Sequence, residues 1–280
     1  IMQNTNSKST VIEAYAMYYD CIKDNDTKNK IVKRVLELCE ISQKQYGYPC
    51  PYIILIDDNK TKIYKNKNTQ HYLWCSKMFY QYYKITNDKL YYKKAEEIVN
   101  YVCDHMYDSS NLTLINWYGD NCNLNKVSVK SLTCAEMLLI FNKKNILDST
   151  LEYMKKNLFN NDTELFDTTF DIVSNERVKN DNSYLHENLE LIEGLYNCWK
   201  YANDKSYKEL SLKLIKNVIP LIEANINNLA PIQCLYWINI FEKEWNMKKN
   251  NYEPIKERVD KIILNFEKNK YISPYNNKNL

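Results

Sequence analysis

Glycine is almost absent from this chain, occurring at three positions among 280 residues. Rossmann and P-loop proteins need several glycines for positive-φ turns and close backbone approaches, and sandwiches or barrels need many tight turns. Helical proteins need fewer such positions, because their loops can turn on Asn and Asp, which tolerate the left-handed conformation. The glycine content therefore predicts an all-α protein.

Apolar residues recur with helical spacing from one end of the chain to the other. The periodicity predicts ten helices, at 11–24, 28–45, 70–84, 88–107, 128–143, 146–158, 185–202, 204–224, 230–245 and 252–268. Short polar turns join these helices in pairs, and the pairs are separated by long connections at 46–69, 108–127 and 159–184. This alternation is typical of a series of antiparallel helical hairpins.

Two of the short turns are similar to each other. The segments 83–91 and 199–207 share Lys, Asn, Asp, Lys and Tyr at equivalent positions, and Asn145 lies midway between the two turns. We predict that Asn87 and Asn203 each end a helix in the left-handed conformation and that the following Asp caps the next helix. Such a repeat predicts stacked hairpins.

The long connections all fall on one side of the predicted array, which favours a closed α/α toroid over an open solenoid. Five hairpins are visible, and a sixth would complete a ring. Short β-hairpin segments are expected in the long connections, at 52–56 with 61–64 and at 112–117. We expect one toroid domain over residues 1–280, with residues 1–10 disordered and residues 270–280 forming a C-terminal tail.

Charge and cysteine usage exclude several classes of protein. The net charge of +3 comes with no basic stripe, so no nucleic-acid partner is expected. The nine cysteines form no CxxC pair, and the three histidines form neither HExxH nor HxxxH. We therefore expect free buried thiols in a reducing compartment, no metal site and no cofactor. With no apolar signal core and no membrane span, a cytoplasmic location is expected. The initial Ile1 suggests either a cloning remnant or a trimmed end, and a natural chain that extends upstream is one expectation.

Parts of the chain resemble a known superfamily. Residues 72–106 have the form apolar helix, Tyr, Asn-Asp turn, Tyr, helix, which is similar to six-hairpin (α/α)6 proteins of carbohydrate metabolism, including N-acylglucosamine 2-epimerase-like proteins and glycoside hydrolases. A second stretch resembles the helical C-terminal region of thioredoxin-like proteins related to spermatogenesis-associated protein 20. The matching residues are Phe-Asp-Thr at 166–168, Arg-Val-Lys at 177–179 and Asp-Asn at 181–182. The likeness covers about 70–245 and implies a six-hairpin toroid. The thioredoxin CxxC is absent, and the paired histidines of an epimerase have no assigned position.

In such a toroid the long loops gather at one open end of the ring, here called the mouth. Two carboxylates there could act as general acid and base on a sugar, and aromatic rings could stack on it. The candidate catalytic residues are Asp120, Asp181, Glu187 and His186. The candidate substrate-binding residues are Trp117, Tyr118, Tyr184, Asp167, Asp171, Arg177 and Trp74.

Most candidates also have a structural explanation. Asp57 and Asp58 fit the tip of a strand turn, Asp181 can cap a helix, and Glu187 can stabilise a first helical turn through the helix dipole. Trp74 lies at the spacing of a core residue. Gly119 interrupts an aromatic and acidic loop, which makes 116–121 the first place to look for a site.

These observations lead to three function hypotheses. The first is a carbohydrate-active or carbohydrate-derivative-processing enzyme, glycoside hydrolase or epimerase-like, with a small-molecule or oligosaccharide ligand. The second is a non-catalytic helical scaffold that binds a peptide or protein partner. The third is an acyl-transfer enzyme in which Cys50, in a Pro-Cys-Pro loop, is a nucleophile activated by His71 or His186.

Overall fold

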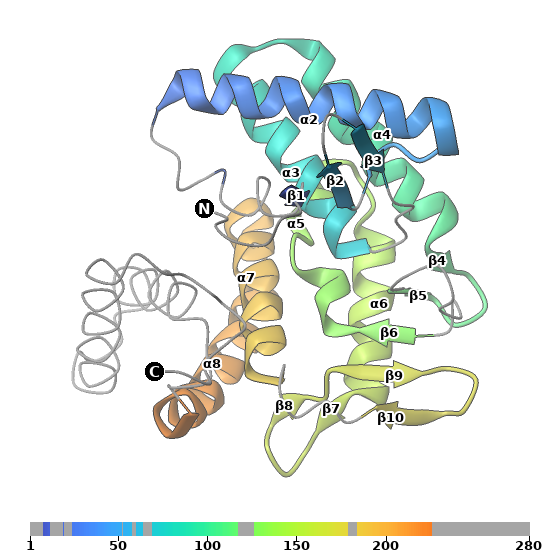
Figure 1. Cartoon of the computed structure of the whole chain (residues 1–280). Coiled ribbons are helices and arrows are strands. Elements are labelled where there is room, and N and C mark those ends of the chain that lie inside the picture. Colours follow the sequence, from blue (N-terminus) through green and yellow to red (C-terminus); the bar gives the residue numbers. More distant parts are fainter. Residues whose placement is uncertain are drawn as a thin grey trace.

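The computed structural model describes residues 8–11, 19, 24–51, 53–57, 60–63, 69–116, 126–178 and 184–225. Its helices are α2 (Asn25–Tyr46), α3 (Thr69–Thr86), α4 (Lys89–His105), η2 (Val129–Leu132, a 3-10 helix), α5 (Glu136–Ile140), α6 (Lys144–Asn157), α7 (Tyr184–Ala202) and α8 (Lys205–Asn225). Its strands are β1 (Lys8–Val11), β2 (Ile53–Asp57), β3 (Lys60–Ile63), β4 (Tyr107–Asp108), β5 (Thr113–Leu114), β6 (Lys126–Ser128), β7 (Phe159–Asn160), β8 (Leu165–Phe166), β9 (Thr169–Asp171) and β10 (Glu176–Val178). The protein is mainly helical, with short antiparallel strands in its connections (Figure 1).

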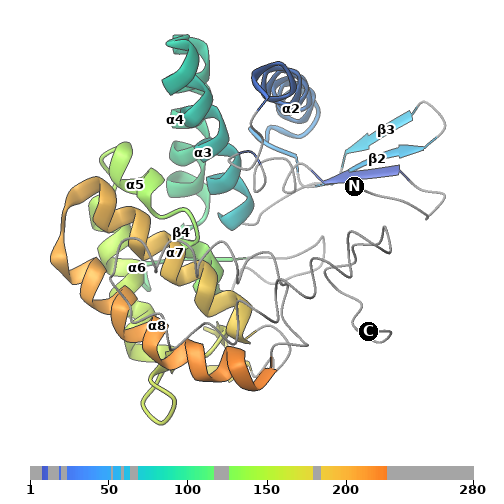
Figure 2. The same ribbon diagram turned by 90° about the vertical axis from the view of Figure 1, so that its left-hand side faces the viewer.

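Consecutive helices form hairpins. α3 packs along α4, α5 contacts α6, and α7 packs along α8, while α2 contacts α3. Figure 2 shows α7 and α8 as one pair and α3 and α4 as another, with the sheet β1–β2–β3 on the side of α2. The predicted order of helix pairs is therefore confirmed over the hairpins that the structure describes.

The turn chemistry is as predicted in two hairpins. Asn87 has φ 56° and Asn203 has φ 53°, so both residues are left-handed. The Asp88 Oδ1 atom accepts a hydrogen bond from Leu90 N at 2.9 Å, and the Asp204 Oδ1 atom accepts one from Ser206 N at 3.0 Å. Asn ends one helix and Asp caps the next in each case.

The turn between α5 and α6 was predicted too far along the chain. Its left-handed residue is Asn142 (φ 60°), whereas Asn145 lies inside α6. The Lys143 N–H donates to Leu138 O at 2.7 Å, which is the long bond of a Schellman motif and closes α5 one turn earlier than the apolar pattern suggests. The equal spacing of the three turns was therefore wrong.

The predicted helix at 128–143 is broken into β6, η2 and α5. Ser128 Oγ accepts from Lys130 N at 3.3 Å and Thr133 Oγ1 donates to Lys130 O at 2.8 Å, so hydroxyls replace helical bonds here. β6 pairs with β9, so Ser128 belongs to a strand and not to the predicted helix. The broken segment packs closely against α7 at Gly194. If Gly194 carried a Cβ atom, that atom would lie 1.8 Å from Leu132 O.

Residues 8–11 form β1, although residues 8–10 were expected to be disordered and residue 11 to begin a helix. The strand pairs antiparallel with β2, from Lys8 opposite Ile56 to Val11 opposite Ile53. β2 and β3 form the predicted hairpin, with Asp57 opposite Lys60, and β5 pairs with β4. The predicted helices at 230–245 and 252–268, and most of the one at 11–24, lie outside the described residues.

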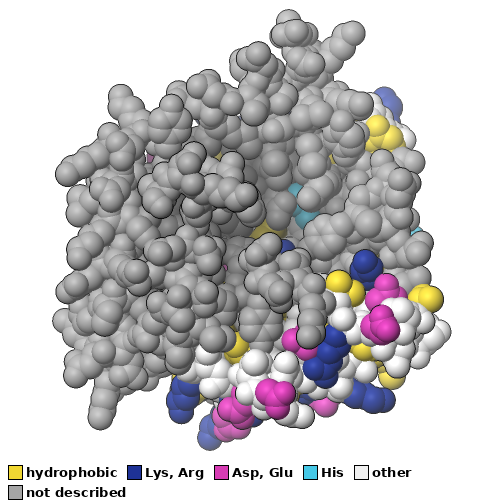
Figure 3. All heavy atoms as spheres, turned by 60° about the horizontal axis from the view of Figure 1, so that its bottom comes forward, with side chains coloured by type: hydrophobic (Ala, Val, Ile, Leu, Met, Phe, Trp, Pro, Cys, Tyr) yellow, Lys and Arg dark blue, Asp and Glu magenta, His cyan; other side chains and the backbone are white. Residues whose placement is uncertain are grey.

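The core is one cluster that runs through all the hairpins. Among its largest fully buried side chains are Tyr72, Phe79, Ile98 and Phe166. On the face shown in Figure 3, the described surface mixes basic and acidic side chains, with small apolar areas between them. Within the described residues, no helix is both long enough and apolar enough to cross a membrane.

Candidate functional site

Several predicted site residues lie outside the part of the chain that the structure describes: Trp117, Tyr118, Asp120 and Asp181. Tyr184 and His186 lie in the first turn of α7. Glu187, one residue further, is 5% exposed. The structure therefore places three of the predicted residues together at the start of one helix.

The loops that carry the other candidates are anchored next to η2. The Asn116 N–H donates to Lys126 O at 2.8 Å, which closes the base of the 117–125 connection. In the sheet β10–β9–β6, Val178 lies opposite Thr169, which lies opposite Ser128. Val178, at the end of β10, and Ser128, before η2, thus lie in the same sheet on opposite sides of Thr169.

Asp167 and Arg177 bind each other. The Arg177 Nη1 atom donates to Asp167 Oδ2 at 2.8 Å, while Nε donates to Asn157 O at 2.8 Å and Nη2 to Phe159 O at 3.1 Å. The Arg177 guanidinium therefore holds the segment between α6 and β10 together, because its planar group has several N–H donors that bond to three residues at once. These contacts give both residues a structural role in the loop.

Asn188 fastens the same connection to α7. Its Nδ2 atom donates to Phe166 O at 2.8 Å, and its Oδ1 atom accepts from Phe166 N at 3.0 Å, so the amide pairs with β8 as a strand would. Asn188 is fully buried. The bond pair fixes the loop relative to the first turn of α7.

Asp171 and Trp74 also have local explanations. Asp171 Oδ1 accepts from Val173 N at 3.0 Å and Ser174 N at 3.2 Å, which stabilises the turn between β9 and β10. Trp74 is 6% exposed and belongs to the hydrophobic core. A ring so deeply packed is poorly placed to stack on a ligand.

A row of carboxylates follows one face of α7. Glu187, Glu190 and Glu193 are three residues apart, a spacing that puts side chains on the same face of a helix. Lys130 Nζ lies 3.2 Å from Glu187 Oε1, and Lys77 Nζ lies 3.6 Å from Glu193 Oε1. Between them, Glu190 Oε2 accepts from the Gln70 side-chain amide at 2.9 Å.

Glu136 and a second hydrogen bond of Gln70 extend this set of polar contacts beyond α7. Lys77 Nζ also lies 3.1 Å from Glu136 Oε1, and Gln70 Nε2 donates to Thr133 Oγ1 at 3.3 Å. Glu190 is 2% exposed and Glu136 is 7% exposed. We call the set the polar seam: Gln70, Lys77, Lys130, Glu136, Glu187, Glu190 and Glu193. It runs between α3, the η2–α5 segment and α7, and burying its charges is tolerated because they are paired.

One end of the polar seam lies where three long connections enter the helices. Gln70 is in the first turn of α3, Lys130 is in η2, and Glu187 is in the first turn of α7. Among the residues that the structure describes, the buried hydroxyls of Ser131 and Thr168 at this end have no hydrogen-bond partner. Buried hydroxyls are costly to leave unsatisfied, which is typical of positions that bind a further polar group.

Sequence reasoning found Glu187 but missed the rest of the polar seam. The Glu187–Glu190–Glu193 spacing on an otherwise apolar helix was a signal, since charged residues are seldom found on a buried face. No local signal identifies Lys130 or Gln70 as their partners. Lys130 was assigned to a regular helix that the structure does not contain.

The structure brings Cys50 and His71 together, as the acyl-transfer hypothesis required. Cys50 is 0% exposed, however, and burial raises the pKa of its thiol well above the ordinary value. The His71 Nε2 atom lies 2.7 Å from Pro51 O, to which it must donate because a carbonyl oxygen only accepts. A protonated, inaccessible thiol beside an imidazole that is already hydrogen-bonded argues against a nucleophile.

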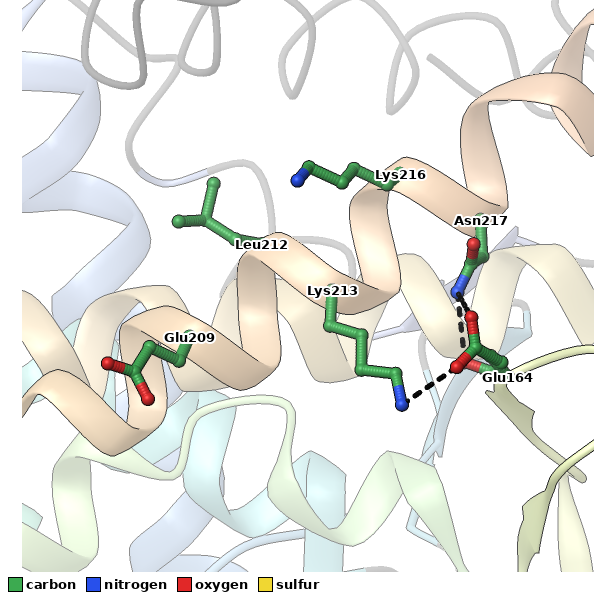
Figure 4. A pocket seen from close by; sticks show the side chains of 6 residues that line it. All are labelled: Glu164, Glu209, Leu212, Lys213, Lys216 and Asn217. Atoms are coloured by element: carbon green, nitrogen blue, oxygen red, sulfur yellow. Dashed lines mark hydrogen bonds and ion pairs between the residues drawn. The ribbon is translucent and has the colours of Figure 1, made fainter.

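An open groove follows the outer side of α8 and is lined by Glu164, Glu209, Leu212, Lys213, Lys216 and Asn217 (Figure 4). In this view Lys213 and Asn217 point toward Glu164. Lys213 Nζ lies 2.9 Å from Glu164 Oε1, and Asn217 Nδ2 donates to Glu164 Oε2 at 3.4 Å. Its polar groups bind one another at the surface, so this groove has less of the character of a reaction site than the polar seam.

No protein-family model matches the chain, and no curated protein matches it in sequence. Solved structures do resemble it. Cellobiose 2-epimerase from Bacillus thermoamylovorans has 9% identity and a TM-score of 0.67, covering 98% of this chain and 80% of its own. An alpha-amylase from Clostridium perfringens has 15% identity and a TM-score of 0.60, covering 95% of this chain and 78% of its own.

A third similar structure is an inactive variant of the family 76 alpha-1,6-mannanase of Salegentibacter, changed at two adjacent aspartates and bound to alpha-1,6-mannotetraose. It has 16% identity and a TM-score of 0.52, and the match covers 75% of this chain and 60% of the mannanase. Identities this low establish the fold and leave the activity open. The hairpin order and these similarities together show that the chain has the α/α toroid fold that the sequence resemblance implied.

Proposed function

We propose that this protein is a carbohydrate-processing enzyme whose site is the mouth end of the polar seam, with Glu187 as an acid/base residue. The observation that carries the proposal is the ion pair between the buried Glu187 and the partly buried Lys130, where the connections before α3, η2 and α7 enter these helices. Catalytic groups of such enzymes are carboxylates held in place by neighbouring charges.

The surroundings of Glu187 favour the role of a base. A lysine ammonium at 3.2 Å favours the ionised carboxylate, which is the form that accepts a proton or stabilises a developing positive charge on a sugar ring. Lys130 is itself held by the short helix η2, whose backbone contacts α7. The pair would therefore keep its geometry when a ligand binds.

A second carboxylate is needed for hydrolysis, and we assign this role to Asp181 or Asp120. The end of β10, before residues 179–183, lies in the same sheet as the strand that leads into η2, and the base of 117–125 is closed by the hydrogen bond from Asn116 N to Lys126 O. Hydrolysis would need the two carboxyl groups about 5–9.5 Å apart, with the shorter separation for retention and the longer for inversion. Epimerisation would instead use Glu187 and a second acid/base group, for which His186 is the candidate.

The comparisons support a sugar as the ligand class. The similar structures include an epimerase of a disaccharide, an alpha-amylase and a mannanase bound to a tetrasaccharide. We infer that this chain takes a small oligosaccharide, with Trp117, Tyr118 and Tyr184 as the stacking surface. Aromatic rings suit this task because they present an apolar face and, in Tyr, a polar edge.

The test begins with thermal-shift screening of the protein against mono- and oligosaccharides, including alpha-1,6-mannosides, alpha-1,4-glucans and cellobiose. Any sugar that raises the melting temperature is then tested for turnover. Glu187→Gln should keep the fold and lower kcat by about 10²–10⁴-fold, the usual contribution of a general acid or base.

Glu193→Gln is the matched control, because Glu193 lies on the same face of α7 two turns further from the loops. It should leave kcat within a few-fold of the wild type. Asp181→Asn and Asp120→Asn identify the second carboxylate. Full turnover by Glu187→Gln, or equal losses in Glu187→Gln and Glu193→Gln, would contradict the assignment, and the absence of any stabilising sugar would favour the scaffold hypothesis.

A further inference from the structure

Three side chains with strong affinity for soft metal ions meet in the core, away from the polar seam. Cys50 lies in the loop after α2, and His71 and Cys75 lie in α3. The two α3 residues are four positions apart and so share one face of the helix. The sulfur, nitrogen and sulfur atoms of the three residues lie within 4.8 Å of one another, and all three residues are fully buried.

The distances between these donor atoms are close to those of a metal site. Cys50 Sγ lies 3.1 Å from Cys75 Sγ, and Cys75 Sγ lies 4.0 Å from His71 Nε2. Bonds of about 2.3 Å from zinc to sulfur and about 2.0–2.1 Å from zinc to nitrogen would place tetrahedral donors about 3.8 Å (S–S) and about 3.5 Å (S–N) apart. These two distances would therefore change by about 0.7 Å and about 0.5 Å on metal binding.

A fourth donor is close at hand. Cys39, on α2, is fully buried and lies beside Cys50, outside the three donors that are within 4.8 Å of one another. The four residues thus come from α2, the loop that follows it, and α3. Three thiols and one imidazole form the Cys₃His set of closed structural zinc sites.

Simple core packing is the competing explanation, since free cysteines behave as small apolar residues. It accounts for Cys39 and Cys75, and the hydrogen bond to Pro51 O satisfies His71 Nε2, but packing does not require an imidazole so close to the thiols of Cys50 and Cys75. Zinc binds cysteine as thiolate, and the negative thiolates and the positive metal ion neutralise each other in the core.

We propose that Cys50, His71 and Cys75, with Cys39 as the fourth donor, form a structural zinc site. Zinc would displace the thiol protons to solvent and bind His71 through Nε2, which would give up its hydrogen bond to Pro51 O as the ring proton moves to Nδ1. The site would join α2 and the 47–51 loop to α3. All three close ligands are fully buried, which indicates a contribution to folding and not to the reaction.

The first experiment uses the unmodified chain, purified with reductant and without chelator, and measures its metal content by elemental mass spectrometry. About one zinc per chain is expected, as is thiolate-to-metal charge-transfer absorption when Co²⁺ replaces zinc. Zinc titration of the metal-free protein should release about two protons if Cys39 stays protonated and about three if it binds. No retained metal, or the release of fewer than two protons, would overturn the proposal.

Variants test the named ligands. Cys50→Ser and Cys75→Ser should lose the metal and the cobalt absorption, and a chelator should lower the melting temperature of the wild type but not of these variants. Cys198→Ser is the matched control, since Cys198 is an equally buried thiol on α7. Equal metal loss in Cys198→Ser, or a Cys50–Cys75 disulfide in the intact mass of the protein kept under reductant, would also refute a zinc site. The proton-release measurement stands even if a serine variant fails to fold.

Discussion

Replacing Gly194 with alanine tests how closely the broken segment around η2 must approach α7. A Cβ atom at this position would lie 1.8 Å from Leu132 O, 3.0 Å from Leu132 C and 3.1 Å from Thr133 O. All three are backbone atoms, which cannot rotate away as the end of a side chain can. Leu132 and Thr133 follow Lys130, so the same contact positions the ion pair with Glu187.

Two opposing terms set the size of the effect. Alanine is favoured over glycine by about 0.8–1.0 kcal/mol in the interior of a helix, so in open space the substitution would stabilise α7. Relief of the clash needs a backbone displacement of more than 1 Å, and overpacking of this kind costs about 1–3 kcal/mol or more. We expect a net loss of about 1–2 kcal/mol, which lowers the melting temperature by about 2–4 °C for each kcal/mol in a protein of this size.

The measurement is chemical denaturation of Gly194→Ala, together with hydrogen exchange of residues 129–140. Exchange should rise there, because η2 and α5 must move away from α7. Asn197→Ala is the control: it lies on the same helix, is only partly buried and should gain up to about 0.7 kcal/mol from helix propensity alone. A Gly194→Ala protein as stable as the wild type, or more stable, would refute the close approach of the two segments.

Two further predictions concern the hairpin turn between α7 and α8. Asn203→Val should lower the free energy of unfolding by about 1–2 kcal/mol, because φ 53° is strained for a branched residue, whereas Asn203→Gly should stay close to the wild type; denaturant titration measures both. The pKa of Asp204 is lowered from its ordinary 3.8, first by the hydrogen bond from the Ser206 hydroxyl and then by that from the Ser206 N–H. Because the pKa of Asp204 is lower in the folded than in the unfolded protein, the ionised carboxylate stabilises the fold. This stabilisation is fully present above pH ~4 and is lost as the pH falls through the lowered pKa. Asp204→Asn should therefore show a flatter loss of stability at acid pH, and an unchanged acid profile would contradict this reasoning.

Local chemistry explains which parts of the fold could be predicted. The turns at Asn87 and Asn203 depend on contacts between residues at most four positions apart, so their sequences were sufficient. The same holds for α7, because the helical spacing of its apolar residues predicts both the helix and its buried face. The segment 128–143 also has helical spacing, but its outcome depends on β9 and Gly194, which are distant in sequence. Pattern alone could not show that those contacts outweigh the local helical preference.

The candidate sites divide in the same way. Glu187 was predicted from its place after a long loop, and the structure adds what it binds. Its pairing with Lys130, and that of Glu190 with Gln70, require three separate segments to be brought together. The zinc proposal is a clearer case still. Motif spacing argued against a metal site, because such motifs describe ligands that are neighbours in sequence.

The sequence by itself determined a helical chain with few glycines, in which Asn and Asp make the turns between paired helices. It did so because helix periodicity and capping act over a few residues. Only the tertiary structure decided that α7 carries a buried row of carboxylates against η2 and α3, and that thiols from α2 and the following loop meet His71. Burial and pairing of polar groups depend on which distant surfaces come into contact, and that is settled only when the helices pack.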